Sequence, residues 1–236
     1  MENAATLLSW GAEGWADEIA AGIVVTVSLA LATLPFGMLL GFFIALAKQA
    51  EEPSLRLAAN IYTTIFRGLP ELLTLFLVYF GVQIGLTEAM KALGFSEGVE
   101  VNSFVAGMFA LGVVFSSYAS EVFLSAFRAI PKGQYEGGYA VGLSWGQTMR
   151  LVVLPQLVRI ALPGLANLWL VLLKDTALVS VIGLSDILRQ TGIAARVSKE
   201  AFLFYGIACL LYLALAMISS IGISAIERRA ARGTVR

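Results

Sequence analysis

Long runs without a charged side chain constrain this chain more than any other feature of its sequence. Residues 19–47 contain no Asp, Glu, Lys or Arg, and residues 201–226 are uncharged as well. A transmembrane helix needs about 20 consecutive apolar residues to cross the hydrocarbon core of a bilayer. Over the whole chain 58% of residues are hydrophobic and 14% are charged, whereas soluble domains carry about 25% charged residues. The sequence therefore predicts an all-α polytopic membrane protein.

Five membrane spans account for the apolar segments. Their approximate limits are 19–47, 60–87, 101–127, 150–173 and 201–226. The chain is then divided into an external N-terminal segment (1–18), one transmembrane domain (19–227) and a basic cytoplasmic tail (228–236). The loop at 131–149 is the largest polar insertion, and we expect it to be the place where a soluble partner binds.

The distribution of basic residues predicts the orientation, because Lys and Arg mark cytoplasmic loops. They occur in the first loop, the third loop and the tail, at Lys48, Arg56, Arg128, Lys132, Arg150, Arg228, Arg229, Arg232 and Arg236. The first 18 residues contain acidic side chains but no Lys or Arg, so we expect an uncleaved N-terminus outside the cell and a cytoplasmic C-terminus. The loop at 174–200 is basic although this topology places it outside. We interpret it as a folded, gate-like segment; the alternative is a miscounted span.

The composition excludes several kinds of site. The chain has no His and one Cys, Cys209. This excludes His/Cys metal sites, Ser–His and Cys–His catalysis, and disulfides. The formal net charge is zero, so nothing indicates a nucleic-acid partner. Because the chain also lacks a phosphate-binding loop, we expect no enzyme activity and no cofactor bound by this chain.

The polar loop has the pattern of two short helices joined by a turn. Residues 134–141 have helical character, and Gly142 suits a left-handed residue that ends a helix. Ser144, with Gln147 three residues later, is typical of a capping box that opens a second helix. An amphipathic loop lying on lipid headgroups is the alternative.

This loop resembles the EAA motif of the permease subunits of bacterial ABC importers. Glu136, Gly137, Gly138, Gly142, Val152, Leu154 and Pro155 fall in register with that motif. Glycine replaces alanine at 137 and 138, and valine replaces isoleucine at 152. The glycines weaken the first helix by about 1 kcal/mol each.

Further segments resemble polar amino-acid permeases of the histidine/arginine/octopine branch, which have five spans. They are residues 66–73, 120–123, 129–134 and 173–183. With the loop, the resemblance extends over about residues 20–225. It implies the type I importer permease fold and transport of basic amino acids or opines, such as arginine, histidine, lysine, ornithine and octopine. An importer of glutamine, glutamate or cystine is the alternative, followed by a secondary transporter or channel.

The resemblance also implies partners. They are a second permease subunit, more often a related chain than a copy, two ATPase subunits that bind ATP and Mg²⁺, and an external solute-binding protein. The loop would be the coupling helix held in a groove of the ATPase, with contacts from Glu136, Gly137, Gly138, Tyr139, Gly142, Leu143, Trp145, Leu154 and Pro155. Tyr139 and Trp145 as headgroup anchors are the alternative.

Polar residues near the spans are candidates for a translocation path or gate, because ionisable groups are costly in lipid. A proline is a candidate because it implies a local break, where freed carbonyl groups can line a cavity. The candidates are Arg67, Pro70, Glu121, Lys174, Asp175 and Thr176. For Glu121 we favour an ion pair with Arg67 or Arg128. For Asp175, contact with a positively charged side chain and capping of the segment from Thr176 are both open.

Overall fold

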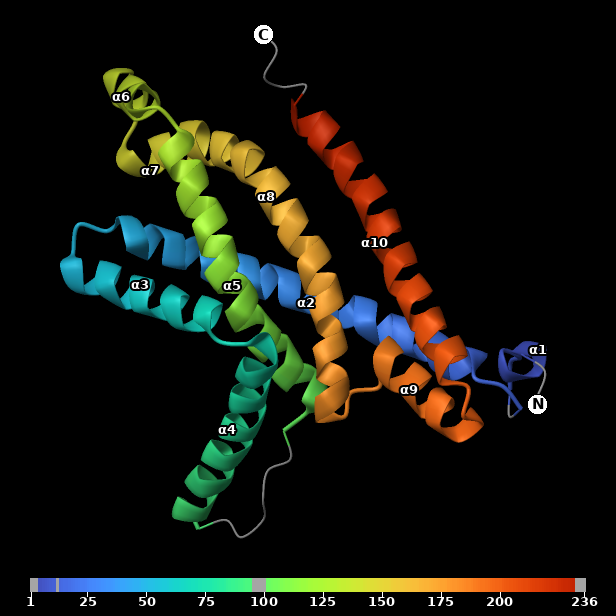
Figure 1. Cartoon of the computed structure of the whole chain (residues 1–236). Helices are drawn as coiled ribbons and strands as arrows, with labels where there is room; N and C mark the ends of the chain where they lie inside the picture. The colour runs from blue at the N-terminus through green and yellow to red at the C-terminus, as the bar shows by residue number, and fades with distance from the viewer. Residues whose placement is uncertain (1–3, 12, 95–100, 232–236) are drawn as a thin grey trace.

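The structure is a computed structural model that describes residues 4–11, 13–94 and 101–231, and every regular element in these ranges is helical. Figure 1 shows their arrangement. In chain order they are α1 (Ala4–Leu7), α2 (Ala16–Gln49), α3 (Pro53–Gly68), α4 (Glu71–Ala92), α5 (Ser103–Ala129), α6 (Lys132–Ala140), α7 (Trp145–Thr148), the π-helical turn η1 (Met149–Val153), α8 (Leu154–Asp175), the 3₁₀ helix η2 (Thr176–Ile182), α9 (Ile187–Ser198) and α10 (Ala201–Ala231).

Five stretches of helix in the described ranges are long and apolar enough to cross a membrane. They are Ala16–Gln49, Glu71–Ala92, Ser103–Ala129, Trp145–Ile182 and Ala201–Ala230. Their number agrees with the predicted five spans, and the all-α fold class is confirmed. The fourth is longer than predicted, because α7, η1, α8 and η2 continue into one another.

The predicted second span over 60–87 is wrong as a single helix. The backbone is extended at Leu69 (φ −88°, ψ 143°) and Pro70 (φ −57°, ψ 132°). Proline has no N–H to donate and disfavours the helical conformation in the residue before it. The chain therefore ends α3 at Gly68 and begins a separate spanning helix, α4, at Glu71.

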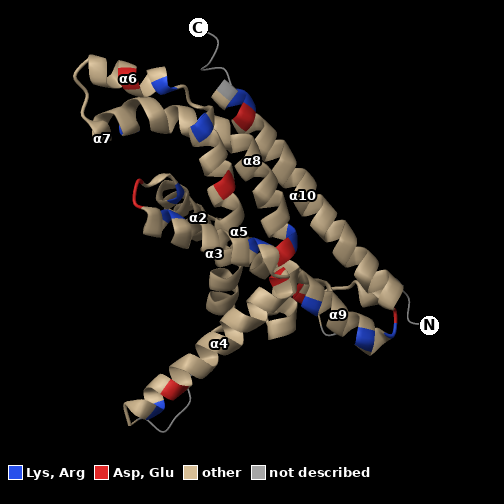
Figure 2. Ribbon diagram, turned by 60° about the vertical axis from the view of Figure 1, so that its left-hand side comes forward, with Lys and Arg blue, Asp and Glu red and all other residues tan. Residues whose placement is uncertain are grey.

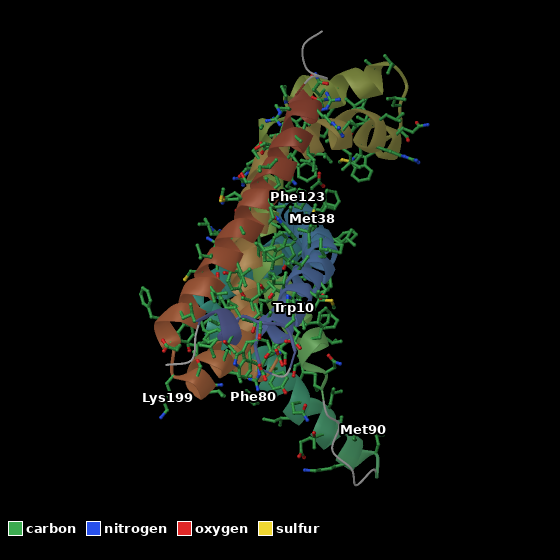
Figure 3. The ribbon with its side chains drawn as sticks, turned by 90° about the vertical axis from the view of Figure 1, so that its right-hand side faces the viewer. Trp10, Met38, Phe80, Met90, Phe123 and Lys199 are labelled. Atoms are coloured by element: carbon green, nitrogen blue, oxygen red, sulfur yellow. The ribbon has the colours of Figure 1, made fainter. Side chains whose placement is uncertain are left out.

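Helix α5 lies at the centre of the bundle. It packs against α2, α4 and α8, and more of its apolar stretch is buried than in any other candidate span. Leu29 of α2, Phe115 of α5 and Leu157 of α8 belong to this core. Met38 and Phe123, labelled in Figure 3, pack in the same cluster.

Helices α4 and α10 leave most of their apolar surface uncovered. Figure 2 shows charged residues near their ends and none along their middles. In Figure 3, Met90 lies near the tip of α4, away from the packed bundle. Such surfaces are stable against lipid or against another membrane helix.

The two ends of the molecule carry different elements. In Figure 1, α6 and α7 lie at the same end as the C-terminal end of α10, whereas α1 and α9 lie at the opposite end. The basic segment at 174–200 is folded, as predicted, into η2 and α9.

Candidate functional site

The polar loop between α5 and α8 forms a two-helix elbow, which consists of α6, the turn at 141–144 and α7. Gly142 ends α6 with a φ of +83°, a left-handed conformation. The N–H of Gly142 donates to the carbonyl of Tyr139 (3.0 Å), and the N–H of Leu143 donates to the carbonyl of Gly138 (3.1 Å). These two bonds form a Schellman motif, in which glycine takes the left-handed position. The predicted turn at Gly142 is confirmed.

The start of α7 has the predicted capping box. The Oγ of Ser144 accepts a hydrogen bond from the N–H of Gln147 (3.4 Å), and the N–H of Ser144 donates to Oε1 of Gln147 (2.9 Å). Both bonds satisfy N–H groups that have no partner within the helix. The elbow is thus held by specific hydrogen bonds on both sides of its turn.

The two glycines of the motif lie in different surroundings. A Cβ atom on Gly138 would lie 2.6 Å from Cγ2 and 2.7 Å from Oγ1 of Thr148, whereas a Cβ on Gly137 would meet open space. Thr148 is 1% exposed, so its short, branched side chain has little room to move. Gly138 therefore lets α6 and α7 pack closely, and Gly137 has no such role.

The outer surface of the elbow exposes large side chains. Tyr139 is 46% exposed and Trp145 is 64% exposed, which agrees both with aromatic anchors in the groove of a partner and with headgroup anchors. Among the other predicted coupling residues, Glu136 and Pro155 are exposed, Leu143 is half-buried, and Leu154 is half-buried against the core of the bundle.

A π-helical turn and two glutamines join the elbow to α8. Nε2 of Gln156 donates to Oε1 of Gln134 (2.9 Å), which links α8 to α6, and also to the carbonyl of Val152 (2.9 Å) in η1. Pro155 has no N–H, so the backbone around it cannot complete the ordinary helical ladder. Sequence reasoning missed this Gln134–Gln156 clamp, because the two residues are 22 positions apart and glutamine alone signals nothing.

The carboxylate of Glu121 joins three helices. It forms an ion pair with Lys48 at the end of α2, and NH1 of Arg67 at the end of α3 lies 3.3 Å from the same oxygen. The guanidinium of Arg67 also lies 5.6 Å from the ring centre of Tyr118. The predicted pair with Arg67 is present, whereas Arg128 is exposed. Sequence reasoning did not identify Lys48 as a partner of Glu121, because the two residues are 73 positions apart.

Two carboxyl groups line a small cavity beside this ion cluster. Glu71 at the start of α4 and Asp175 at the end of α8 share it with Tyr118 and with apolar residues of α5 and α8. Its volume is about 20 Å³, enough for roughly one water molecule. Two acidic side chains that face one cavity attract positive charge.

The remaining predicted path residues are sequence neighbours of the two acidic residues of the cavity. Lys174 is exposed, and Thr176 is buried with its hydroxyl bonded to the carbonyl of Leu173 (2.7 Å). Asp175 makes no capping hydrogen bond to η2, so the capping alternative is wrong. The helical backbone continues through Asp175 (φ −67°, ψ −20°), which leaves no free helix start to cap. Pro70 is exposed and forms the break between α3 and α4.

The bundle and the elbow together define a class of protein. Five candidate spans and an elbow with exposed aromatic side chains agree with the resemblance to the membrane subunit of an ABC importer. Residues 37–232 match the family described as "Binding-protein-dependent transport system inner membrane component". The chain belongs to this family.

Curated relatives extend the match over nearly the whole chain. The nopaline transport system permease protein NocQ of Agrobacterium fabrum is 42% identical over 97% of this chain and 97% of its own length. The histidine/lysine/arginine/ornithine transport system permease protein HisQ of Salmonella typhimurium is 37% identical over 94% of this chain and 97% of its own. The resemblance to this branch of permeases is confirmed.

Solved structures agree on the fold. The crystal structure of an amino acid ABC transporter with histidines superposes with a TM-score of 0.76 at 31% identity, covering 91% of this chain and 95% of the other. The methionine transporter MetNI in an inward-facing conformation gives a TM-score of 0.71 at 18% identity, over 90% and 96% of the two chains. The type I importer permease fold is therefore confirmed.

Proposed function

We propose that this chain is the membrane-spanning subunit of an ATP-driven importer for basic amino acids or opines. The observation that carries the choice of solute is the cavity lined by Glu71 and Asp175. Arginine, lysine, ornithine and many opines carry a cationic group, which two carboxylates attract in a site of low dielectric constant. The named solutes of the relatives NocQ and HisQ support the same choice.

The path opens and closes by alternating access. The cavity of about 20 Å³ is too small for an amino acid, so solute enters only when the helices around it separate. The force comes from two ATPase subunits, which hold ATP and Mg²⁺ and close against each other. The elbow lies in a groove of one ATPase, and Tyr139 and Trp145 are the side chains that fill it.

The position of the elbow supports the proposed orientation. α6 and α7 lie at the end of the molecule where α10 finishes (Figure 1), so an ATPase bound there places the basic C-terminal tail in the cytoplasm. The N-terminal segment and α9 then face outward, where a solute-binding protein delivers the solute. A related second permease completes the pair, and the uncovered apolar surfaces of α4 and α10 are available to it or to lipid.

Solute binding to the purified complex, without its solute-binding protein, tests this proposal. Asp175→Asn and Glu71→Gln each remove one negative charge from the cavity. We expect the Kd for labelled arginine to rise by at least about tenfold. Each variant removes a carboxylate that would pair with the cationic group of the solute, and the loss of one member of such a charge pair is costly. The Kd for glutamine, which has no cationic side chain, should change much less.

Glu88→Gln is the matched control. Glu88 lies on the same helix as Glu71 but is exposed, and it pairs with Lys91 at 2.8 Å. This variant should bind arginine as the wild type does. If arginine affinity is unaffected by Asp175→Asn and Glu71→Gln, or if glutamine and arginine lose affinity equally, the cavity does not select basic solutes.

A further inference from the structure

A single tyrosine hydroxyl at the outer part of the bundle meets three other elements. Tyr212 of α10 donates a hydrogen bond to Oδ2 of Asp186 (3.3 Å). The same hydroxyl lies beside the side-chain hydroxyls of Thr26 in α2 and Thr176 at the start of η2. Thr26, Thr176 and Asp186 are each 0% exposed. Buried polar groups of this kind are costly unless they bond to one another.

Asp186 anchors the start of α9 within this group. Its Oδ1 accepts from the N–H of Arg189 (2.9 Å), and Oγ1 of Thr26 accepts from the N–H of Ile187 (3.3 Å). The guanidinium of Arg189 is directed elsewhere, to the carbonyl of Ser180 in η2 (3.1 Å). The segment from η2 to α9 is thereby attached to α2 and to α10.

This group of polar side chains around the Tyr212 hydroxyl lies next to the cavity. Thr176, which lies beside the Tyr212 hydroxyl, directly follows Asp175, one of the two acidic residues of the cavity. Thr176 also bonds back to the carbonyl of Leu173 at 2.7 Å. A shift of Thr176 therefore moves the end of α8 and the carboxylate beside it.

We propose that Tyr212 is a positioning residue, whose hydroxyl bonds Asp186 and packs beside Thr176, so that the Asp175 carboxylate is kept facing the solute. This inference rests on the proposed function, because it assigns Asp175 to solute binding. Tyr212 itself touches no solute. Without its hydroxyl, Asp186 loses a hydrogen bond and Thr176 loses a neighbouring group, and the segment from η2 to α9 is free to move relative to α10.

Tyr212→Phe tests the inference, because it removes one oxygen and keeps the ring. Tyr205→Phe is the matched control on the same helix, since Tyr205 is 45% exposed. In the purified complex with its ATPase, Tyr212→Phe should raise the Kd for arginine about fivefold, the effect of losing one hydrogen bond. Asp186→Asn should raise it similarly, and the double variant should show less than the product of the two effects.

A second measurement follows the anchoring directly. Amide hydrogen exchange over residues 176–187 should be faster in Tyr212→Phe than in Tyr205→Phe. If Tyr212 has a merely structural role, Tyr212→Phe lowers the thermal stability but leaves the Kd for arginine unchanged, and that result overturns the inference. Unchanged amide exchange over residues 176–187 also overturns it. A wild-type complex that binds no arginine contradicts the proposed function instead, and the exchange measurement still decides whether Tyr212 anchors the segment.

Discussion

At the scale of single residues, replacing either of two adjacent glycines in the elbow with alanine should change the stability in opposite directions. Gly137→Ala should raise the free energy of unfolding by about 1 kcal/mol, because alanine favours a helix and the new methyl group meets open space. Gly138→Ala should lower it by about 1–3 kcal/mol, since its Cβ would lie 2.6 Å from the Thr148 side chain. Thermal unfolding of the two variants in detergent measures both effects. Equal stability of the two variants would contradict the close packing of α6 on α7.

A second prediction at this scale concerns pH. Burial raises the pKa of the Asp186 carboxyl from 3.8 to about 6, although hydrogen bonds from Arg189, Leu188 and Tyr212 partly oppose the effect. The folded chain therefore binds this proton more tightly than the unfolded chain. The stability that results is complete below pH 3.8 and is lost as the pH rises through 6.

The comparison of wild type with Asp186→Asn isolates this group from other carboxylates. Between pH 7.5 and pH 4.5, the free energy of unfolding of the wild type should rise relative to that of the variant by about 2 kcal/mol. Denaturant unfolding at the two pH values measures the difference. A difference that does not depend on pH rules out a raised pKa for Asp186.

At the scale of elements, the Gln134–Gln156 clamp joins the elbow to α8. Gln156→Leu should leave ATP hydrolysis by the reconstituted complex intact but reduce the solute moved per ATP about two- to fivefold, since a hydrogen bond of about 1 kcal/mol is lost. Gln49→Leu is the control, because Nε2 of Gln49 bonds, among the described residues, to a carbonyl of its own helix, that of Ala45 (3.1 Å). If both variants move the same amount of solute per ATP, the Gln134–Gln156 clamp does not transmit force from the elbow to α8.

Some features of these elements can be predicted from the sequence, and others cannot. The turn at Gly142 and the capping box at Ser144 were predictable, because both depend on local hydrogen bonds between neighbouring residues. The break at Leu69–Pro70 had the same kind of local signal, because a proline interrupts a helix, although the predicted limits of 60–87 extended across it. Lys48 and Gln156 were not predictable from spacing, because their partners come from distant helices.

At the scale of the whole molecule, the number of spans follows from hydrophobic runs, but their packing does not. α4 and α10 are about as apolar as α5 or more so, yet α5 is the buried centre and the others are exposed. Composition does not distinguish a helix that faces lipid from one that faces protein. In the same way, the cost of a charge near lipid made Asp175 a candidate, but only the packing of α4 against α5 brings Glu71 into the same cavity.

We propose above that the elbow carries force from an ATPase into the bundle. Photo-crosslinking in native membranes tests whether the elbow contacts that ATPase. A photoreactive residue replaces Val141, which is 76% exposed in the turn of the elbow, or Phe202, which is 96% exposed at the opposite end of the molecule. We expect the probe at 141 to capture the ATPase subunit and the probe at 202 not to capture it. Failure to capture the ATPase at 141, or equal capture at both positions, would contradict it.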